Sequence, residues 1–333
     1  MTTESPVFPP PPQGHAVETE ALKSLKFYAD NYTPLMFRSL GAGNEKIVLG
    51  SEPFECRFCG GKPPESTFIK RAHAVSELLG NKILESLYEC DDCNKRFSTF
   101  EDDLGKMTLA TRSIGGVIGK NGIPKLISGI RRAGRKATME FKEGGLHVSH
   151  DAGDLGFVED EATKTLTLTY VEHPYRPLGA YKALAKSAFT LLPANELGHF
   201  PELKRWLLQA DLTTDSAGGS YTCYTTFVQA FQPFKQPIVC LLKRNSKIDA
   251  PYMSFFVATG NVSYQIFLPC PSQDAHLQGK EITFPGFPHY FQLQPWLIPG
   301  SVIAGQIDLG ASDRTTKRTG TMSWRYENKV KVE

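Results

Sequence analysis

The sequence lacks the segments that mark membrane and secreted proteins. It has no apolar run near the roughly 20 residues that a membrane-spanning helix needs, and residues 1–6 lack the basic and apolar regions of a secretory signal peptide. It also has no P-loop, glycine-rich nucleotide fingerprint or internal repeat, which argues against the nucleotide-binding and solenoid folds that these patterns mark. We therefore expect a cytoplasmic protein without a membrane segment.

Charge and composition are those of an ordinary globular protein. The chain of 333 residues is 41% hydrophobic and 22% charged, and its length allows two domains with sizeable cores. A net charge of +2 neither indicates nor excludes a nucleic-acid partner. The seven cysteines are arranged poorly for a disulfide framework, and in a chain without a secretory segment they agree with a reducing compartment.

Four of the cysteines form two C-x-x-C pairs, Cys56 with Cys59 and Cys90 with Cys93. Two such pairs suit a structural Zn²⁺ site, because each pair supplies two thiolates to a tetrahedral ion from one tight turn. The zinc would hold together the ends of the intervening segment, which carries His73. The cysteines alone would equally describe a zinc ribbon that serves only binding or structure.

The residues around the cysteines resemble those of a known family. The order is Cys-x-x-Cys, then FIKRAHAV at 68–75 and ELLGN at 77–81, then ECDDCN at 89–94. Over roughly residues 52–105 it resembles the HNH (ββα-metal) nucleases, especially the zinc-clamped branch that includes endonuclease VII-type resolvases and standalone bacterial HNH proteins. The resemblance implies a ββα-metal fold, with His73 as the general base and Asn94 at the catalytic metal on the final helix.

The residue types agree with phosphodiester hydrolysis. That reaction needs a base to deprotonate water and a cation to neutralise charge on the phosphate oxygens. A neutral imidazole, with a reference pKa of about 6.5, suits the first task near neutral pH. The side-chain carbonyl of Asn94 suits a hard ion, and we expect Mg²⁺ or Mn²⁺.

The chain departs from the family pattern at Ala72, where the family has an Asp, Glu or His that ligates the metal. We predict that Glu101 supplies the missing carboxylate, because it lies seven residues after Asn94 and returns to the same face of a helix. Asp102 is less well aimed. The alternative is an ordinary solvated acidic run at 101–103.

A basic segment follows, with eight basic residues and no acidic one between positions 104 and 136. Such clusters bind phosphates without reading bases, so we predict a track for nucleic acid, DNA in preference to RNA. The alternative is a solvated basic surface. The predicted backbone contacts are Lys120, Lys125, Arg131, Arg132, Arg135 and Lys136.

The rest of the chain predicts helices followed by a run of strands. Apolar residues recur at helical spacing over 178–192, which places Lys182 and Lys186 outward, and Pro201 opens a second helix. A short helix is expected at 16–29, after a disordered Pro-rich stretch at 1–14. Strands are expected at 138–141, 146–148, 163–171, 222–229, 237–243, 253–259 and 262–268.

Three smaller patterns favour structural roles. Cys223, Cys240 and Cys270 lie in apolar surroundings and are predicted to be buried strand thiols. The cluster of His147, His150 and Asp151 falls at a strand end, where a structural role is favoured over a metal site. The tail at 314–333 mixes basic and aromatic residues, and a solvated strand is favoured over contact with bases.

The predicted fold class is α+β, a ββα-metal zinc-bound nuclease module followed by a larger domain with a mostly antiparallel sheet. The predicted regions are a disordered Pro-rich start with a short helical arm (1–50), the nuclease module (51–105), a linker region with basic residues and β-strands (106–175), and a C-terminal α+β domain of unknown role (176–333).

The predicted function is that of an HNH endonuclease that cleaves DNA with structural Zn²⁺ and catalytic Mg²⁺ or Mn²⁺. The C-terminal domain would recognise a substrate, a regulatory ligand or a protein, and anti-phage defence is what the resemblance to standalone bacterial HNH proteins implies. Because Ala72 stands where the family has a metal ligand, the alternative is a non-catalytic zinc-ribbon protein that binds nucleic acid or acts as an adaptor. A third possibility is a nuclease that stays silent until its C-terminal domain receives a ligand or partner.

Overall fold

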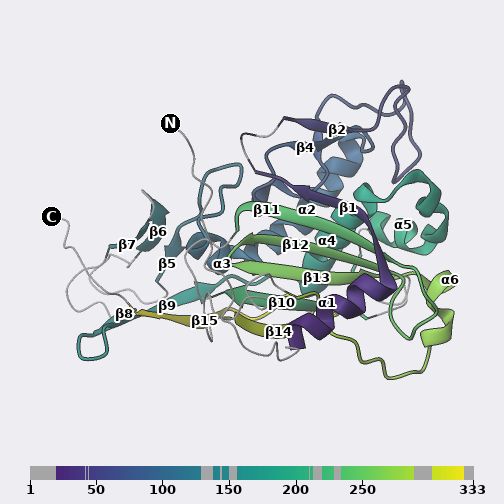
Figure 1. Cartoon of the computed structure of the whole chain (residues 1–333). Helices are drawn as coiled ribbons and strands as arrows, with labels where there is room; N and C mark the ends of the chain where they lie inside the picture. Colours follow the sequence, from purple (N-terminus) through teal and green to yellow (C-terminus); the bar gives the residue numbers. More distant parts are fainter. Residues whose placement is uncertain are drawn as a thin grey trace, which may run out of the picture.

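The computed structural model contains one large antiparallel sheet (Figure 1). The strand order is β1-β11-β12-β13-β10-β14, and each neighbouring pair is antiparallel. The prediction of an α+β fold with a mostly antiparallel sheet is therefore confirmed. The structure describes residues 20–41, 43, 45–128, 138–142, 145–149, 156–209, 211–212, 220–228, 234–288 and 302–325. The strands are β1 (Tyr32–Ser39), β10 (Thr222–Val228), β11 (Phe234–Arg244), β12 (Met253–Gly260), β13 (Val262–Leu268) and β14 (Val302–Asp308).

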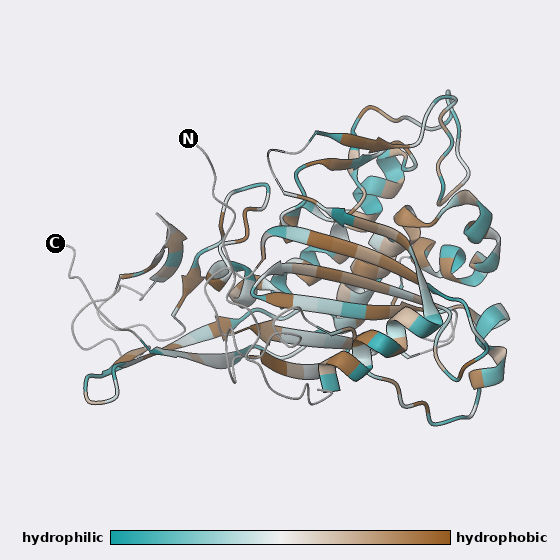
Figure 2. Cartoon of the chain, viewed as in Figure 1, coloured by the Kyte–Doolittle hydropathy of each residue, from teal (hydrophilic) through white to brown (hydrophobic). Residues whose placement is uncertain are grey.

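The central strands β12 and β13 are buried at every residue because both faces of the sheet are covered. On one face, Val257 of β12 and Ile266 of β13 belong to the main core together with helix α4 (Pro177–Leu191). On the other face, Phe256 packs with Tyr28 from helix α1 (Glu20–Asn31). Figure 2 shows apolar residues concentrated on these central strands.

The edge strand β1 comes from the region that the sequence assigned to a helical arm. The predicted helix is present as α1, but the next eight residues pair with β11 along its length. The arm therefore contributes directly to the sheet of the large domain. The Pro-rich stretch at 1–14 lies outside the described residues.

Helix α4 is buried at all of its residues, and this corrects the prediction that Lys182 and Lys186 point outward. The helix lies between the sheet and helix α2 (Asp91–Met107), so no face is left for solvent. Alanine occupies several positions between the larger apolar residues, so the helix is apolar on nearly all of its faces. Buried ammonium groups need partners, and Nζ of Lys182 donates to the carbonyl oxygens of Trp206 (2.8 Å) and Gln209 (3.0 Å) at the end of α5 (Pro201–Leu208).

A small sheet precedes α2. Strand β3 (Ala72–His73) pairs antiparallel with β4 (Leu84–Ser86), and β2 (Ile47–Leu49) adds to the other edge of β4 in parallel. A single 3-10 turn, η1 (Glu77–Leu79), lies in the connection between β3 and β4. The chain order from His73 onward is therefore β3, η1, β4 and α2.

One hydrophobic core runs from the small sheet through α4 to the large sheet. The ring of Phe58, in the turn between Cys56 and Cys59, lies 4.6 Å from the ring of Phe97 on α2 and 5.3 Å from that of Phe189 on α4, measured between ring centroids. The cysteine region therefore packs directly against α4 of the large domain.

Two further three-stranded sheets share a separate core that includes Ile114, Met139 and Leu168. The strands predicted at 138–141, 146–148 and 163–171 are confirmed as β6, β7 and β9. The tail forms β15, which pairs with β9 and is largely exposed, and this agrees with a solvated strand. His147 lies on β7, whereas His150 and Asp151 lie outside the described residues. The strands are β5 (Leu126–Ile127), β6 (Thr138–Lys142), β7 (Gly145–Ser149), β8 (Phe157–Asp160), β9 (Thr165–Glu172) and β15 (Arg318–Arg325).

The remaining elements are short. They are α3 (Leu109–Ile114), η2 (Ala194–His199), α6 (Pro271–Asp274) and η3 (Ala275–Leu277). Cys223 and Cys240 are buried strand thiols as predicted, and Cys270 is buried but lies just beyond the end of β13. No helix within the described part of the chain is long and apolar enough to cross a membrane.

Candidate active site and metal centre

The four cysteines of the two C-x-x-C pairs form one cluster. All four Sγ atoms lie within 4.8 Å of one another, and the Sγ atoms of Cys59 and Cys90 are 3.7 Å apart. Sulfurs bound tetrahedrally to zinc at about 2.3 Å would be separated by roughly 3.8 Å. The cluster, called here the cysteine cluster, therefore fits a tetrahedral metal ion such as Zn²⁺, as the sequence predicts.

Local backbone geometry brings the thiols together. Cys56 and Cys59 flank a tight turn in which the amide of Gly60 donates to the carbonyl of Cys56 (2.8 Å), and the amide of Gly61 donates to Sγ of Cys59 (3.4 Å). Cys90 is the N-cap of α2 and Cys93 lies in its first turn. A hydrogen bond from the Cys93 thiol lowers the pKa of the Cys56 thiol, which favours the thiolate, the form that ligates metals.

Arg57 anchors the cysteine cluster to the large domain. Its guanidinium group donates to the carbonyl oxygens of Thr190 (2.8 Å) and Leu192 (2.7 Å) at the end of α4. The same group stacks over the ring of Tyr88 at 3.7 Å from the ring centroid. A cation at the C-terminus of a helix satisfies the free carbonyl groups there and interacts favourably with the negative end of the helix dipole. The Arg57 contact therefore holds the cysteine cluster against α4.

A cavity of about 630 Å³ lies beside the cysteine cluster, and the predicted site residues meet there. His73 reaches it from the end of β3, and Asn94 and Glu101 reach it from α2. Lys120, from the segment after α3, also lines it. This space is called the site cavity below. It joins residues from three separate parts of the chain, and their catalytic roles stay predictions.

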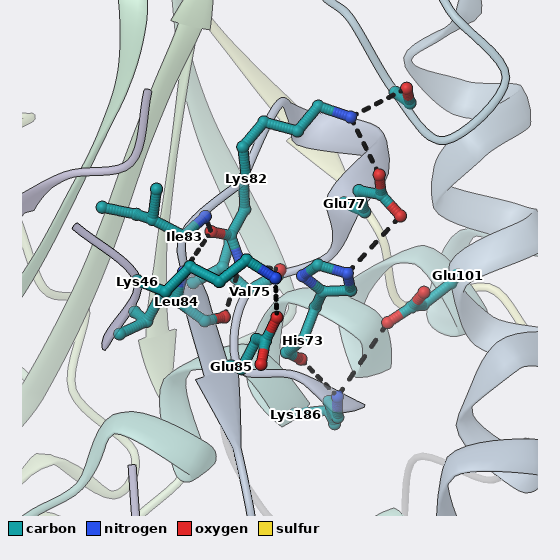
Figure 3. A network of polar contacts seen from close by, with 12 residues as sticks. Lys46, His73, Val75, Glu77, Lys82, Ile83, Leu84, Glu85, Glu101 and Lys186 are labelled. Atoms are coloured by element: carbon teal, nitrogen blue, oxygen red, sulfur yellow. Dashed lines mark hydrogen bonds and ion pairs between the residues drawn. The ribbon is translucent and has the colours of Figure 1, made fainter. Parts of the chain in front are cut away.

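His73 is held on one side by a carboxylate. Its Nε2 lies 3.5 Å from Oε2 of Glu77, and Oε1 of Glu77 accepts from Nζ of Lys82 at 2.8 Å (Figure 3). Lys82 also donates to the carbonyl of Gly119 (2.9 Å), which ties this network to the loop that carries Lys120. Burial lowers the pKa of His73 below its usual 6.5 even though Glu77 acts to raise it. The imidazole is therefore neutral at pH 7 and able to accept a proton.

Asn81 pins the loop between β3 and β4. Its Nδ2 donates to the carbonyls of Val75 (2.7 Å) and Leu84 (2.8 Å), while Oδ1 accepts from the amides of Ile83 (3.2 Å) and Leu84 (2.9 Å). The side chain is fully buried and uses both ends of its amide. The hydrogen bonds of the Asn81 side chain therefore join the two ends of the loop that begins at His73.

The acidic run at 101–103 divides into three different environments. Glu101 lines the site cavity, Asp102 pairs with Lys106 on the same helix, and Asp103 is fully buried. Asp103 accepts from the main-chain amide of Arg176 (3.0 Å) and from its Nε (2.8 Å), just before α4 begins. The alternative of a solvated run is wrong for Asp103, and among the three carboxylates Glu101 is the one at the cavity.

The basic segment contributes less to the cavity than its charge suggests. Among its members in the described residues, Lys120 is exposed on the cavity, whereas Arg112 also lines it but is mostly buried and donates to the carbonyl of Gly105 (2.8 Å). Lys125 is not among the cavity-lining residues and pairs with Glu140 at 2.7 Å. Lys70 and Arg71, outside the predicted track, also line the cavity, and Arg71 pairs with Glu85 at 3.2 Å. The predicted contacts Arg131, Arg132, Arg135 and Lys136 lie outside the described residues.

Two residues of the site were missed by reasoning from the sequence. Glu77 follows His73 by four positions, a spacing that could have drawn attention to it. Lys186 on α4 reaches the same site, and Figure 3 shows its ammonium group between the carbonyl of His73 and the carboxylate of Glu101. The helical periodicity predicted that Lys186 points outward, so Lys186 was not among the predicted site residues. Ala72 is buried and offers no ligand atom.

Comparison with protein-family models, curated proteins and solved structures gives no match for this chain. What the structure defines is an α+β protein with a cluster of four cysteines suited to a metal ion. Its function is therefore argued from the residues of the site cavity.

Proposed function

We propose that the protein is a metal-dependent endonuclease of the HNH type that hydrolyses phosphodiester bonds in DNA. The observation that carries this proposal is the meeting of His73, Asn94 and Glu101 at one cavity beside the cysteine cluster. The chain order of β3, β4 and α2, with His73 on the first strand and Asn94 on the helix, supports the same interpretation.

The residues present suit the proposed chemistry. Asn94 and Glu101 offer oxygen atoms of the kind that Mg²⁺ and Mn²⁺ prefer, and they would hold the ion. Such an ion would supply positive charge to the phosphate oxygens and the leaving group. His73 would take the proton of the attacking water as a general base, with Glu77 holding the ring in place.

Positive side chains at the cavity support a polyanionic substrate. Lys70, Arg71 and Lys120 are exposed and line it. Lysine and arginine bind phosphates through charge and hydrogen bonds, and their charge displaces condensed cations from the nucleic acid. These three residues would hold the backbone beside His73, and the Zn²⁺ of the cysteine cluster would be structural.

The test is nicking of supercoiled plasmid with Mg²⁺ or Mn²⁺. We expect cleavage by the wild-type protein, a loss of at least about 100-fold in His73→Ala, and normal cleavage by His276→Ala, which changes an exposed histidine on η3 away from the cavity. Cleavage by the His73→Ala variant at the wild-type rate would contradict the proposed role of His73. Chelation followed by return of Mn²⁺ should abolish and restore the activity.

A non-catalytic protein that binds nucleic acid is the second candidate, and two observations favour it. Ala72 stands where the family places a metal ligand, and Nζ of Lys186 lies 4.0 Å from Oε1 of Glu101, which puts a positive charge near the predicted metal site. Binding of DNA by the wild-type protein, with no cleavage in any divalent ion, would support this candidate instead.

A further inference from the structure

Lys186 is a buried lysine that contacts two residues of the candidate active site, His73 and Glu101, besides its ion-pair partner Glu89. Its Nζ lies 2.8 Å from Oε2 of Glu89. It also donates to the main-chain carbonyl of His73 at 3.1 Å and lies 4.0 Å from Oε1 of Glu101 (Figure 3). The Lys186 side chain is 2% exposed and that of Glu89 is fully buried. One ammonium group on α4 thus contacts the strand that carries His73, the residue before Cys90, and the helix that carries Glu101.

The other buried lysine of α4 shows what a purely structural arrangement looks like. Lys182 lies one turn earlier, and its ammonium donates to main-chain carbonyls at and just after the end of α5, including those of Trp206 and Gln209. It contacts no residue of the site cavity among the described residues. Burial lowers the pKa of Lys182 to about 8, whereas Glu89 and Glu101 outweigh burial at Lys186 and raise its pKa.

Packing alone does not account for Lys186. Replacement of both partners of a buried ion pair by well-packed apolar residues is often neutral or stabilising, so apolar residues at positions 186 and 89 together would fill this place at no greater cost. Oε1 of Glu89 has no hydrogen-bond partner within the described part of the chain, so the pair is not fully satisfied either. What the ammonium group gains at this place is simultaneous contact with His73 and Glu101.

We propose that Lys186 is a positioning residue of the nuclease site, which fixes the main chain at His73 relative to the carboxylate of Glu101. The large domain would then complete the active site through α4, although it contributes no group that touches the substrate. This inference rests on the proposed function. Residues that orient a metal ligand from behind typically change metal affinity or activity by about 10–100-fold when replaced.

The experiment uses the double variant Lys186→Met/Glu89→Gln. It removes one positive and one negative charge, so the net charge beside the divalent ion is unchanged and no lone charge is left buried. We expect the variant to keep about one zinc per chain, to bind Mn²⁺ at least tenfold more weakly by calorimetry, and to lose about 10–100-fold in kcat. The KM for DNA should stay within about twofold, because Lys186 is buried and does not reach the substrate.

Lys182→Met is the matched control. It removes a buried ammonium group from the same face of α4, and it should lower the melting temperature. In its folded form it should keep the Mn²⁺ affinity and kcat of the wild type, since its partners lie at the end of α5. Equal losses of Mn²⁺ affinity in the Lys182 and Lys186 variants would overturn the inference, because they would show a general loss of packing.

The remaining outcomes separate the inference from the function on which it rests. If the wild type cleaves DNA and the double variant matches it in Mn²⁺ affinity and kcat, the positioning role is wrong and the nuclease stands. If the wild type neither cleaves DNA nor binds Mn²⁺, the proposed function is wrong and the inference fails with it. Should the double variant lose its zinc, Lys186→Arg takes its place. That variant keeps the charge opposite Glu89 but cannot place it at the same point, so wild-type behaviour would equally overturn the inference.

Discussion

Nε2 of His73 lies 3.5 Å from Oε2 of Glu77, and Nδ1 of the same ring has no hydrogen-bond partner among the residues that the structure describes. A carboxylate beside Nε2 favours the tautomer that carries its proton there. Nδ1 then carries the lone pair, and because this atom is buried, a water molecule has to enter the space beside it before the ring can take its proton. The proposed general-base role of His73 therefore assigns proton acceptance to Nδ1 and the contact with Glu77 to Nε2.

The first prediction concerns pH. Burial lowers the pKa of His73, and Glu77 opposes that shift because its negative charge stabilises the imidazolium ion. Glu77→Gln removes the charge, so the pKa of His73 should fall further and the acid limb of kcat/KM should move to lower pH. The limb marks loss of the neutral base as pH falls, and in the wild type its midpoint should lie below 6.5.

The measurement is kcat/KM for plasmid nicking across the acid range. Glu281→Gln is the control, because Glu281 is exposed and lies outside the cavity lining, and it should leave the profile unchanged. A shift of the Glu77→Gln limb to higher pH would show that Glu77 does not act on the base in this way.

The second prediction concerns Asn81. Asn81→Ala removes four hydrogen bonds and leaves their main-chain partners buried, so it should lower the free energy of unfolding by about 2–4 kcal/mol. Chemical denaturation measures the loss. Asn245→Ala, at an exposed side-chain contact with Thr33, should change stability by at most about 0.5 kcal/mol. Similar values for the two variants would mean that Asn81 does not hold the loop.

Local sequence patterns predicted the parts of the site that depend on local geometry. The cysteine spacing predicted the cysteine cluster, and the seven-residue interval on one helix predicted that Asn94 and Glu101 would reach the same cavity. The β-rich stretches became strands within a few residues of the predicted bounds, because alternation and β-branched residues report a pleated, half-buried surface.

Long-range packing could not be predicted in the same way. The periodicity of α4 indicated one apolar face, but the helix packs against α2 on one side and the sheet on the other, so its lysines turned inward to polar partners. The ion pair of Lys186 and Glu89 joins residues 97 positions apart, counted as 186 minus 89. Likewise, β1 pairs with a strand about two hundred residues later. No local pattern records such partners.

The third prediction concerns zinc. Cys93→Ser should abolish stoichiometric zinc and unfold the region around the cysteine cluster, because structural zinc supplies about 10–16 kcal/mol of binding energy to such sites. Cys240→Ser, at a buried thiol of β11, should cost stability but leave zinc content unchanged. Elemental analysis and thermal melting of both proteins check this. Full zinc content in the Cys93 variant would place the metal elsewhere.

The fourth prediction concerns the positive residues of the site cavity. Lys120→Ala and Lys70→Ala should each weaken DNA binding and reduce the slope of log affinity against log salt by about 1, because each removes one phosphate contact. Lys125→Ala should change the slope little, since Lys125 pairs with Glu140 and does not line the cavity. Binding is measured across a salt series in the His73→Ala background without added divalent ions, so that no DNA is cleaved. A wild-type slope for Lys120→Ala together with a reduced slope for Lys125→Ala would move the phosphate track away from the site cavity and toward β5 and β6.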